Sequence, residues 1–217
     1  MNPTATAAGT RDRILDAADH LLGRLGYRRM TLDDLARESG VGRRTIYLWF
    51  TSKEEIALTS IDRVVDRLCV RLAEIADRPE SAGERLRAML LERVLFRVDS
   101  VRGYVHSLDD LFAELRPAYM ERRERYFRAE AEIFTRVLRE GRRRGEIVRG
   151  AESEIARSLL LATNSLLPYS LRASELAART RIERAAQRVA DLLLGGLQRR
   201  LAETIPGPRA SNPEVNR

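Results

Sequence analysis

The chain has 217 residues, of which 44% are hydrophobic and 33% charged, so it can bury a substantial core in one large or two small domains. Its formal charge is +7, and a single cysteine and two histidines argue against a disulfide framework, a cysteine zinc cluster and histidine-rich metal sites. No apolar run approaches the roughly 20 residues of a membrane span, and no export signal is recognised. We therefore expect a cytoplasmic protein with no membrane partner, no cofactor and no metal.

Apolar residues recur at helical spacing along nearly the whole chain, and no run of alternating β-branched residues predicts a strand. The sequence therefore predicts an all-α protein. Residues 1–10 and 204–217 hold little to bury, which predicts a flexible tail at each end. Between the tails we expect a short N-terminal domain, 11–52, and a longer helical domain, 53–203.

The N-terminal domain shows signals for three short helices. The first begins at about Arg11 and stops at Gly26, a residue suited to the left-handed position that follows a helix. Thr31 caps the second helix, which ends at Gly40, and the third follows almost at once in the segment RRTIYLWF. Three helices in this space, the last two joined by a Gly-containing turn, predict a helix-turn-helix unit.

The longer domain opens with a capping-box signal, because Ser52 and Glu55 stand three residues apart ahead of an apolar helical pattern. Further apolar stripes follow to the end of the domain. The predicted helices span 53–76, 81–99, 103–113, 117–144, 151–170 and 178–202. The stretch GRRRGEI, residues 141–147, predicts a turn after the long central helix.

Helical geometry decides which face of the third helix is free. Ile46 and Phe50 lie four residues apart on one side, so they would anchor the helix to the core. The opposite side and the flanks carry Arg43, Arg44, Thr45, Tyr47, Leu48 and Trp49. Arginine can bond guanine bidentately, threonine and leucine can touch a thymine methyl, and tyrosine can reach a phosphate. The set predicts a helix that reads the major groove of DNA, and the alternative is a solvated helix with a partly buried aromatic pair.

Ordered positions over residues 11–56 match a known family: Gly26-Tyr27, Thr31, Leu35-Ala36, Gly40-Val41, Thr45-Ile46-Tyr47, Phe50 and Lys53. This segment resembles the N-terminal DNA-binding domain of the TetR (tetracycline repressor-like) transcriptional regulators. The resemblance implies that Thr31, Tyr47 and Lys53 hold DNA phosphates while the start of the third helix reads bases. One departure is Gly42, which stands where relatives commonly have a serine or threonine N-cap. A phosphate-binding hydroxyl is lost there, and the arginine pair that follows is a candidate to compensate.

Beyond residue 56 the resemblance is architectural and implies a helical domain for ligand binding and dimerisation. The two most apolar segments run from Leu159 to Leu167 and from Val189 to Leu197. The resemblance implies that they form a four-helix interface with a second copy of the chain. The candidate interface residues are Leu160, Leu167, Leu193, Gly196 and Leu197. The alternative is that both segments complete the core of one chain.

A ligand pocket is expected between the middle helices. The candidates by residue type are Cys69, Leu72, Met89, Phe96, Tyr104, His106, Phe112, Tyr126, Phe127, Asn164 and Tyr169. For each of these residues, the alternative is a position in the hydrophobic core without ligand contact. Asn164 and His106 are polar groups on apolar stretches, so each needs a partner that a ligand could supply. Pro168 should end or bend its helix and shape a cavity wall. The apolar and aromatic set suggests a small hydrophobic effector.

The basic excess does not lie in the DNA-binding unit. Residues 1–55 hold 9 basic and 8 acidic side chains, whereas residues 56–217 hold 30 and 24. The densest basic stretch, 116–149, has eleven arginines against six glutamates. We expect it to form a solvated helix face with ion pairs one turn apart, with an auxiliary DNA contact or an anionic ligand as alternatives.

Together these signals predict a homodimeric transcriptional repressor that binds double-stranded operator DNA and is released by a small hydrophobic effector. An effector-independent regulator of the same fold is the alternative. An enzyme or a small-molecule carrier is a third possibility from another class. His106 and Ser107 point in different directions on a short helix, and no phosphate-binding glycine loop or metal-spaced cluster occurs. We therefore predict that the protein is not an enzyme.

Overall fold

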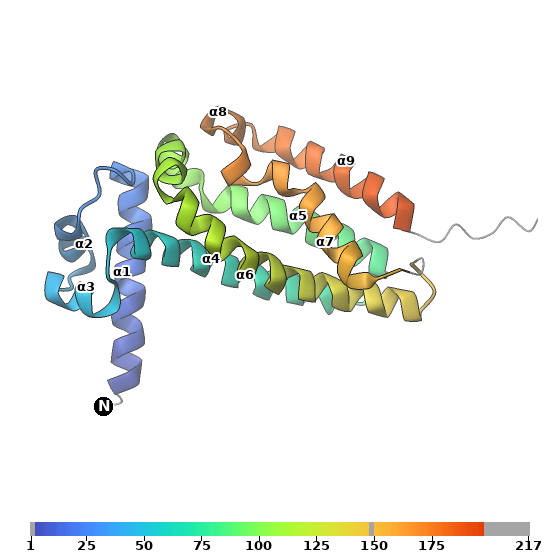
Figure 1. The fold of residues 1–217 in the computed structure, drawn as a ribbon, viewed down its shortest axis with the longest axis horizontal. Coiled ribbons are helices and arrows are strands. Elements are labelled where there is room, and N and C mark those ends of the chain that lie inside the picture. The colour runs from blue at the N-terminus through green and yellow to red at the C-terminus, as the bar shows by residue number, and fades with distance from the viewer. Residues whose placement is uncertain (1–2, 148–149, 198–217) are drawn as a thin grey trace, which may run out of the picture.

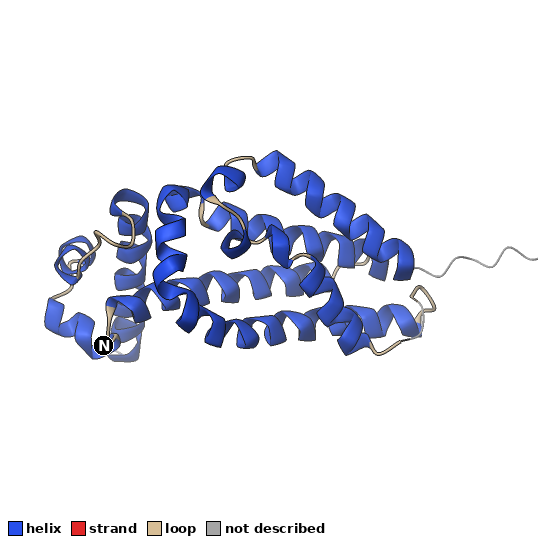
Figure 2. Cartoon of the chain, turned by 45° about the horizontal axis from the view of Figure 1, so that its top comes forward, coloured by secondary structure: helices blue, strands red, loops and turns tan. Residues whose placement is uncertain are grey.

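The computed structural model describes residues 3–147 and 150–197, with side chains from residue 9 onward. Every element within these ranges is a helix (Figure 2), which confirms the predicted all-α class. The predicted tail at 204–217, and the predicted end of the last helix at 202, lie outside the described residues.

Three helices form a compact unit at one end of an elongated molecule (Figure 1): α1 (Pro3–Leu25), α2 (Leu32–Ser39) and α3 (Arg43–Trp49). This is the predicted helix-turn-helix arrangement. The predicted N-terminal tail is wrong from Pro3 onward, because α1 starts there instead of at Arg11. The early segment is rich in alanine, the best helix former, and proline is favoured in a first helical turn. These local preferences extend the helix although the segment has no large apolar residue.

The ends of the short helices follow the predicted signals closely. Gly26 and Gly40 have φ of 76° and 63°, the left-handed conformation that glycine adopts without steric cost. The hydroxyl of Thr31 accepts a bond from the backbone N–H of Asp34, whose carboxylate accepts the Thr31 backbone N–H in return. At the next helix, α4 (Lys53–Ala76), only half of the predicted capping box forms. Ser52 accepts the backbone N–H of Glu55, but the Glu55 carboxylate accepts from the Thr51 N–H at 2.6 Å instead of from Ser52.

The rest of the described chain forms a helical bundle that extends away from this unit (Figure 1). Its elements are α4 (Lys53–Ala76), α5 (Ala82–Ser100), η1 (Arg102–Ser107), α6 (Leu108–Arg143), α7 (Glu152–Ala162), η2 (Asn164–Leu166), η3 (Pro168–Ser170), α8 (Ala173–Leu176) and α9 (Arg179–Leu197). Helix α4 packs against α5 and α6, α6 against α7, and α5 against α9. Since α4 leaves the short unit directly and runs along the bundle, it links the two parts mechanically.

Two predicted helix boundaries in the bundle are wrong. The predicted helices 103–113 and 117–144 are replaced by a 3₁₀ turn and one continuous α6 that contains Pro117. Proline removes one helical hydrogen bond, but Leu115 and Tyr119 on either side are buried, and this packing keeps the helix intact.

The predicted helix 151–170 also stops early, at Ala162. Proline restricts the residue before it to extended backbone, and Leu167 has φ −88° and ψ 152° ahead of Pro168. By contrast, the predicted turn after α6 is present. Gly145 has φ 75°, and its N–H donates to Arg142 O at 3.1 Å while Glu146 N–H donates to Gly141 O at 2.9 Å. This pair of bonds is a Schellman motif.

The buried apolar side chains form two clusters. One runs from the short unit into the near half of the bundle and includes Ile14, Ile46 and Leu111. The other fills the far half and includes Met89 and Phe134. Because the first cluster is shared, a change in the near half of the bundle is felt by the helix-turn-helix unit.

Candidate DNA interface and ligand cavity

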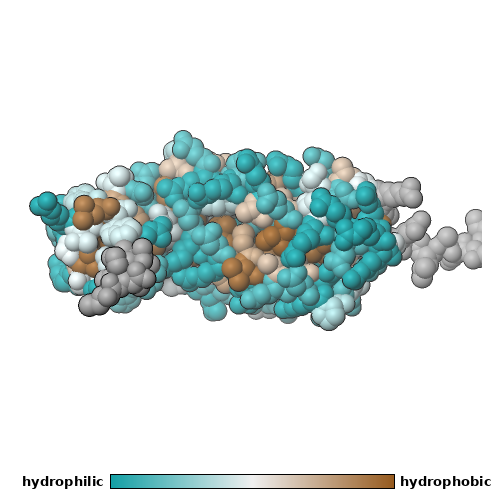
Figure 3. Space-filling model, turned by 90° about the horizontal axis from the view of Figure 1, so that it is seen from below, coloured by the Kyte–Doolittle hydropathy of each residue, from teal (hydrophilic) through white to brown (hydrophobic). Residues whose placement is uncertain are grey.

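The structure presents α3 as the sequence predicts. Ile46 and Phe50 are fully or almost fully buried, at 0% and 3% exposure. The predicted outward set is exposed, with Thr45 half-buried. Leu48 and Tyr47 reach 77% and 48% exposure, and apolar side chains are visible at this end of the molecule on a largely hydrophilic surface (Figure 3). The exposed face of α3 therefore has both the apolar and the cationic groups that a groove-reading helix uses.

The two arginines that follow Gly42 differ in their surroundings. Gly42 is the N-cap of α3 and offers no side-chain cap. Arg43 donates to both carboxylate oxygens of Asp33, at 3.1 and 3.3 Å. Among the described residues, Arg44 has neither an ion pair nor a hydrogen bond nor a ring contact. Arg44 can therefore reach a base edge without first giving up a partner, whereas Arg43 cannot.

Lys53 is held in place by Tyr27. Its ammonium donates to the Tyr27 backbone oxygen at 3.1 Å and lies 4.4 Å from the centre of that ring. Burial, followed by the charges of Glu114 and Glu54, raises the pKa of Tyr27 to about 12, so the ring stays neutral. These two contacts hold the Lys53 ammonium at the start of α4, where the resemblance places a phosphate contact.

Thr31 is less free than the resemblance implies. Its hydroxyl donates to Asp34 at 2.6 Å, and this bond, with the backbone bond beside it, holds the pKa of Asp34 below its usual range. To bind a DNA phosphate, the Thr31 hydroxyl would have to give up its hydrogen bond to the Asp34 carboxylate. The phosphate role of Thr31 stays a prediction.

Salt bridges tie the helix-turn-helix unit to the bundle. Arg63 of α4 pairs with Asp16 and Asp19 of α1, at 2.6 and 2.5 Å. Arg28, in the loop before α2, donates to Glu114 of α6 at 2.8 Å. Arg28 is therefore neutralised by the bundle and adds little to the positive potential that faces DNA.

A narrow cavity of about 50 Å³ lies in the near half of the bundle. It is lined by Ile61, Val64, Val65, Arg97, Val101, Tyr104, Leu108, Leu111, Phe112, Tyr119, Pro168 and Tyr169. Three of the predicted pocket residues, Tyr104, Phe112 and Tyr169, are among them, and Pro168 forms part of the wall as expected. Burial raises the pKa of Tyr104 well above its usual range. The lining is therefore mainly apolar, with Arg97 as its one charged member.

A second, smaller hollow of about 10 Å³ adjoins the cavity and shares Arg97, Tyr119 and Tyr169 with it. The predicted residues Tyr126, Phe127 and Asn164 line this hollow. Asn164 accepts a bond from Arg93 at 2.9 Å, so the partner that its polar group needs comes from the chain itself. The two hollows together bring six predicted pocket residues into one region.

The remaining pocket candidates lie elsewhere. His106 is exposed on η1, and Met89 is completely buried in the far cluster. Leu72 is buried in the same far cluster, and Phe96 packs against it. Cys69 is partly buried and packs against the near cluster, and burial raises its pKa to about 11, so it is an inert thiol. Residue type alone could not separate core from cavity wall, because both are apolar.

The sequence did not identify the aliphatic wall that α4 contributes, or Arg97. Ile61, Val64 and Val65 occupy consecutive turns on one side of α4. Their helical spacing was visible, but the same pattern is typical of any core helix. A buried arginine has no sequence signal of this kind.

The basic stretch of α6 pairs mostly with other helices. Arg122 and Arg125 both bond Asp62 of α4 at 2.6 Å, and Arg136 bonds Asp77 at 2.7 Å. Among the described pairs within the stretch, Arg144 with Glu140 is the one that spans a single helical turn. The prediction of ion pairs one turn apart is therefore wrong for most of these arginines, because their carboxylate partners lie on neighbouring segments and join α6 to them.

The predicted dimer surface needs revision at two positions. Leu160 and Leu167 are buried in the core of the chain itself, at 0% and 2% exposure, so they are not available to a partner. Gly196 is exposed, and Leu193 and Leu197 are partly buried. Leu161 and Leu192, beside the predicted positions, are 57% and 80% exposed.

None of the helices in the described ranges is both long and apolar enough to cross a lipid bilayer. Residues 14–60 match the family model described as "Bacterial regulatory proteins, tetR family". That segment contains α2, α3 and the start of α4, which carry the exposed face described above.

Relatives match over most of the chain. The fatty acid metabolism regulator protein of Bacillus subtilis (strain 168) is 27% identical over 155 residues, which cover 70% of this chain and 77% of the relative. A TetR/AcrR-family regulator from Thermobifida fusca superposes with a TM-score of 0.61 at 28% identity, covering 87% of this chain and 98% of its own. FadR from B. subtilis, solved in complex with stearoyl-CoA, shares the fold with a TM-score of 0.60 at 22% identity, over 85% and 97% of the two chains.

The helix-turn-helix geometry, the family match at residues 14–60 and the similarity of the whole fold agree with one another. The chain belongs to the TetR/AcrR family of DNA-binding transcriptional regulators and is not an enzyme.

Proposed function

We propose that this regulator is a homodimeric repressor that a small apolar effector releases from its operator. The observation that carries the proposal is the position of the cavity. Ile61, Val64 and Val65 of α4 form one of its walls, and the same helix begins at Lys53, directly after the DNA-reading α3. An effector in the cavity therefore touches the helix that positions the DNA-binding unit.

The cavity must widen to accept an effector. Its volume of about 50 Å³ is well below the roughly 300–1,000 Å³ of typical small-molecule sites. An effector that enters has to push the lining helices apart, and binding then favours a second arrangement of those helices.

Two contacts would transmit such a displacement to the DNA-binding unit. Arg63 ties α4 to α1 through Asp16 and Asp19. The turn η1, which contributes Tyr104 to the cavity, packs tightly on the end of α1, where a Cβ on Gly26 would lie 2.8 Å from Ser107 Cβ. A shift of α4 or η1 therefore changes the placement of α1 to α3.

The relatives favour a particular effector class. One is named as a fatty acid metabolism regulator, and FadR was solved with stearoyl-CoA. An apolar cavity against α4 fits an acyl chain. We therefore infer that the effector is a fatty acid or a thioester of one.

The domain boundaries and the dimer belong to the same proposal. Residues 11–52 bind DNA, and residues 53–203 bind the effector and a second chain. The exposed Leu161 of α7 and Leu192 of α9 would pack against the partner, in place of Leu160 and Leu167. A dimer presents two α3 helices to half-sites one or more helical turns apart. Since its target is chromosomal DNA, the protein acts in the cytoplasm.

Operator selection followed by release tests this function. Randomised duplexes are selected on the purified protein, and the selected site is used in gel-shift titrations with fatty acids of increasing length and with their CoA thioesters. We expect a near-palindromic site and release by at least one member of the series. Tight binding that no member of the series weakens would favour an effector-independent regulator instead.

The dimer has its own test. Leu192→Glu should give a monomer by light scattering, because a charge would be buried in the interface. Val70→Glu is the matched control, since Val70 of α4 is 59% exposed and lies outside the proposed surface. A Leu192→Glu protein that remains dimeric would remove α9 from the interface.

A further inference from the structure

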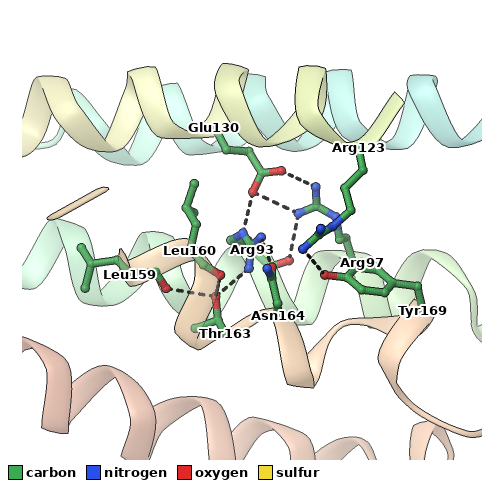
Figure 4. A network of polar contacts seen from close by, with 9 residues as sticks. All are labelled: Arg93, Arg97, Arg123, Glu130, Leu159, Leu160, Thr163, Asn164 and Tyr169. Atoms are coloured by element: carbon green, nitrogen blue, oxygen red, sulfur yellow. Dashed lines mark hydrogen bonds and ion pairs between the residues drawn. The ribbon is translucent and has the colours of Figure 1, made fainter. Parts of the chain in front are cut away.

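A buried polar network joins α5, α6 and the segment after α7 (Figure 4), and its residues line the hollow that adjoins the cavity. The carboxylate of Glu130, on α6, forms ion pairs with Arg93 and Arg97 of α5, each at 2.5 Å. Arg93 also donates to the hydroxyl of Thr163 at 2.6 Å. The three charged side chains are almost fully excluded from solvent, at 2%, 9% and 1% exposure for Arg93, Arg97 and Glu130.

The charges of this network do not balance. Two guanidiniums share one carboxylate, and the other acceptors of Arg93, on Thr163 and Asn164, are neutral. Burial alone would raise the pKa of Glu130, but the charges of Arg97 and Arg93 hold that pKa below its usual range, so Glu130 is ionised. Arginine stays protonated in proteins. Among the described residues, one positive charge of this buried network is therefore left without a carboxylate partner.

A third arginine faces the same hollow. Arg123 of α6 lies over the ring of Tyr169, with its guanidinium carbon 5.3 Å from the ring centre, and donates one N–H to the Tyr169 hydroxyl at 3.2 Å. Within residues 9–147 and 150–197, no carboxylate forms an ion pair with Arg123. A guanidinium has five N–H donors in a planar fork, so Arg123 can still bind a carboxylate.

The hollow that these arginines line is adjacent to the apolar cavity. Arg97, Tyr119 and Tyr169 line both spaces. The apolar side is walled by α4 and the start of α6, whereas Arg93, Arg123 and Glu130 lie on the hollow side. A ligand that fills both spaces has an apolar body and a charged end.

The size of the hollow indicates which charged end fits. It measures about 10 Å³, close to the roughly 10–15 Å³ that one water molecule requires. One oxygen of a head group has that size, and the hollow would widen together with the cavity to admit the whole group. The carbonyl of a thioester is neutral at this end of the chain, whereas a carboxylate is charged. The excess positive charge requires an anion, which excludes an alcohol or an amine as the preferred ligand.

We propose that the effector is a free fatty carboxylate, whose chain lies in the cavity against α4 and whose carboxylate binds Arg123 beside the Arg93–Arg97–Glu130 network. This inference rests on the proposed effector-released function and specifies the head group of the ligand. The carboxylate accepts hydrogen bonds from the open donors of Arg123 and offsets part of the excess positive charge around the hollow. Arg123 is thus a specificity residue, and it would distinguish the free acid from its thioester and its alcohol.

Three ligands with the same chain test the head group. Decanoate, decanol and decanoyl-CoA are titrated into the full-length protein by calorimetry at neutral pH, below the concentration at which they form micelles. A hydrogen bond to a charged group supports a preference of about tenfold or more for decanoate over decanol. Release of the selected operator by the same three ligands is measured in parallel.

Two variants on α6 complete the experiment. Arg123→Gln should weaken decanoate binding by about tenfold and leave decanol unchanged. Arg128→Gln is the matched control, because Arg128 is exposed on the same helix, and it should bind all three ligands as the parent protein does. Thermal unfolding establishes that both variants are folded.

The outcomes separate the two proposals. Decanol or decanoyl-CoA binding as tightly as decanoate, or an unchanged preference in Arg123→Gln, overturns the carboxylate assignment while the effector-released function stands. Failure of all three ligands to bind or to release the operator overturns both. A decanoate preference that Arg123→Gln abolishes and Arg128→Gln retains supports both.

Discussion

The helix-turn-helix unit and the bundle are both helical, but different interactions define them. In the short unit, glycines at positive φ and a capping box set the ends of the helices within a few residues of sequence. In the bundle, the continuity of α6 through Pro117 and the polar network depend on contacts between distant segments, such as Arg93 with Glu130 and Arg93 with Thr163. The comparison shows that an exposed helix face can be specified locally, whereas a cavity built between helices cannot.

The largest expected effect concerns the polar network of the bundle. Glu130→Gln leaves two buried guanidiniums without a counterion, so we expect a loss of about 3–5 kcal/mol in the free energy of unfolding. Urea denaturation followed by circular dichroism measures it. Glu132→Gln, at an exposed position on the same helix, should change stability little. A loss below about 1 kcal/mol for Glu130→Gln would show that the network is not a determinant of the bundle.

The next effect concerns the reading surface of α3. Arg44→Ala should weaken operator binding by about 1–3 kcal/mol and relax the base preference at one position. Arg44 has no competing partner among the described residues, so its loss removes a contact to DNA and disturbs no internal one. Fluorescence anisotropy with operator and random duplexes measures both constants, with the exposed Arg78→Ala as control. Equal losses on the two duplexes would contradict a base-reading role.

The junction between the two regions gives a smaller effect. Gly26→Ala places a side chain at φ 76°, where its Cβ would lie 2.8 Å from Ser107 Cβ. We expect the free energy of unfolding to fall by about 1–2 kcal/mol from the left-handed backbone alone, with the clash adding to it. The double variant Gly26→Ala/Ser107→Gly removes the clash and should recover only that added part. Full recovery would mean that the backbone of Gly26 is not strained by alanine.

Phosphate contacts give an effect without sequence preference. Lys53→Ala should weaken binding to operator and random DNA alike, and should reduce the slope of log affinity against log salt by about 1. Tyr47→Phe should also weaken both duplexes, because it removes the hydroxyl that reaches a phosphate and keeps the ring. Anisotropy titrations over a salt series measure both. An unchanged slope for Lys53→Ala would mean that its ammonium stays on the Tyr27 carbonyl in the complex.

The smallest effect compares the acidic caps of the two regions. Bonds from the side chain and backbone of Thr31 lower the pKa of Asp34, and bonds from Ser81 lower that of Glu84 in the same way. Each carboxylate therefore stabilises the fold above its unfolded-state pKa, and this contribution is lost as the pH falls through the folded-state pKa. The Asp34→Asn and Glu84→Gln variants should therefore lose less stability than the parent protein when the pH falls below about 5. Thermal unfolding over a pH series measures this loss. A parallel decline in all three proteins would show that the caps do not contribute to acid sensitivity.

The sequence predicted the short unit and its exposed residues well, because each signal is local. Gly26, Thr31 and Gly40 mark helix ends in their own right, and the spacing of Ile46 and Phe50 alone decides which side of α3 is free. The cavity was predicted only in part. Tyr104, Phe112 and Tyr169 do line it, but Met89 is a core residue, and no local pattern distinguishes these two environments.

By itself, the sequence determined the all-α class and the helix-turn-helix unit, and it identified the residues on the exposed side of α3. These features depend on backbone preferences and helical periodicity, which act over a few residues. Only the tertiary structure decided that α6 continues through Pro117, that Leu160 is buried within its own chain, and that Arg93 and Arg97 share Glu130. Each of these features results from packing between segments that are far apart in the chain. Burial there outweighs local backbone preference and determines which charged side chains form ion pairs.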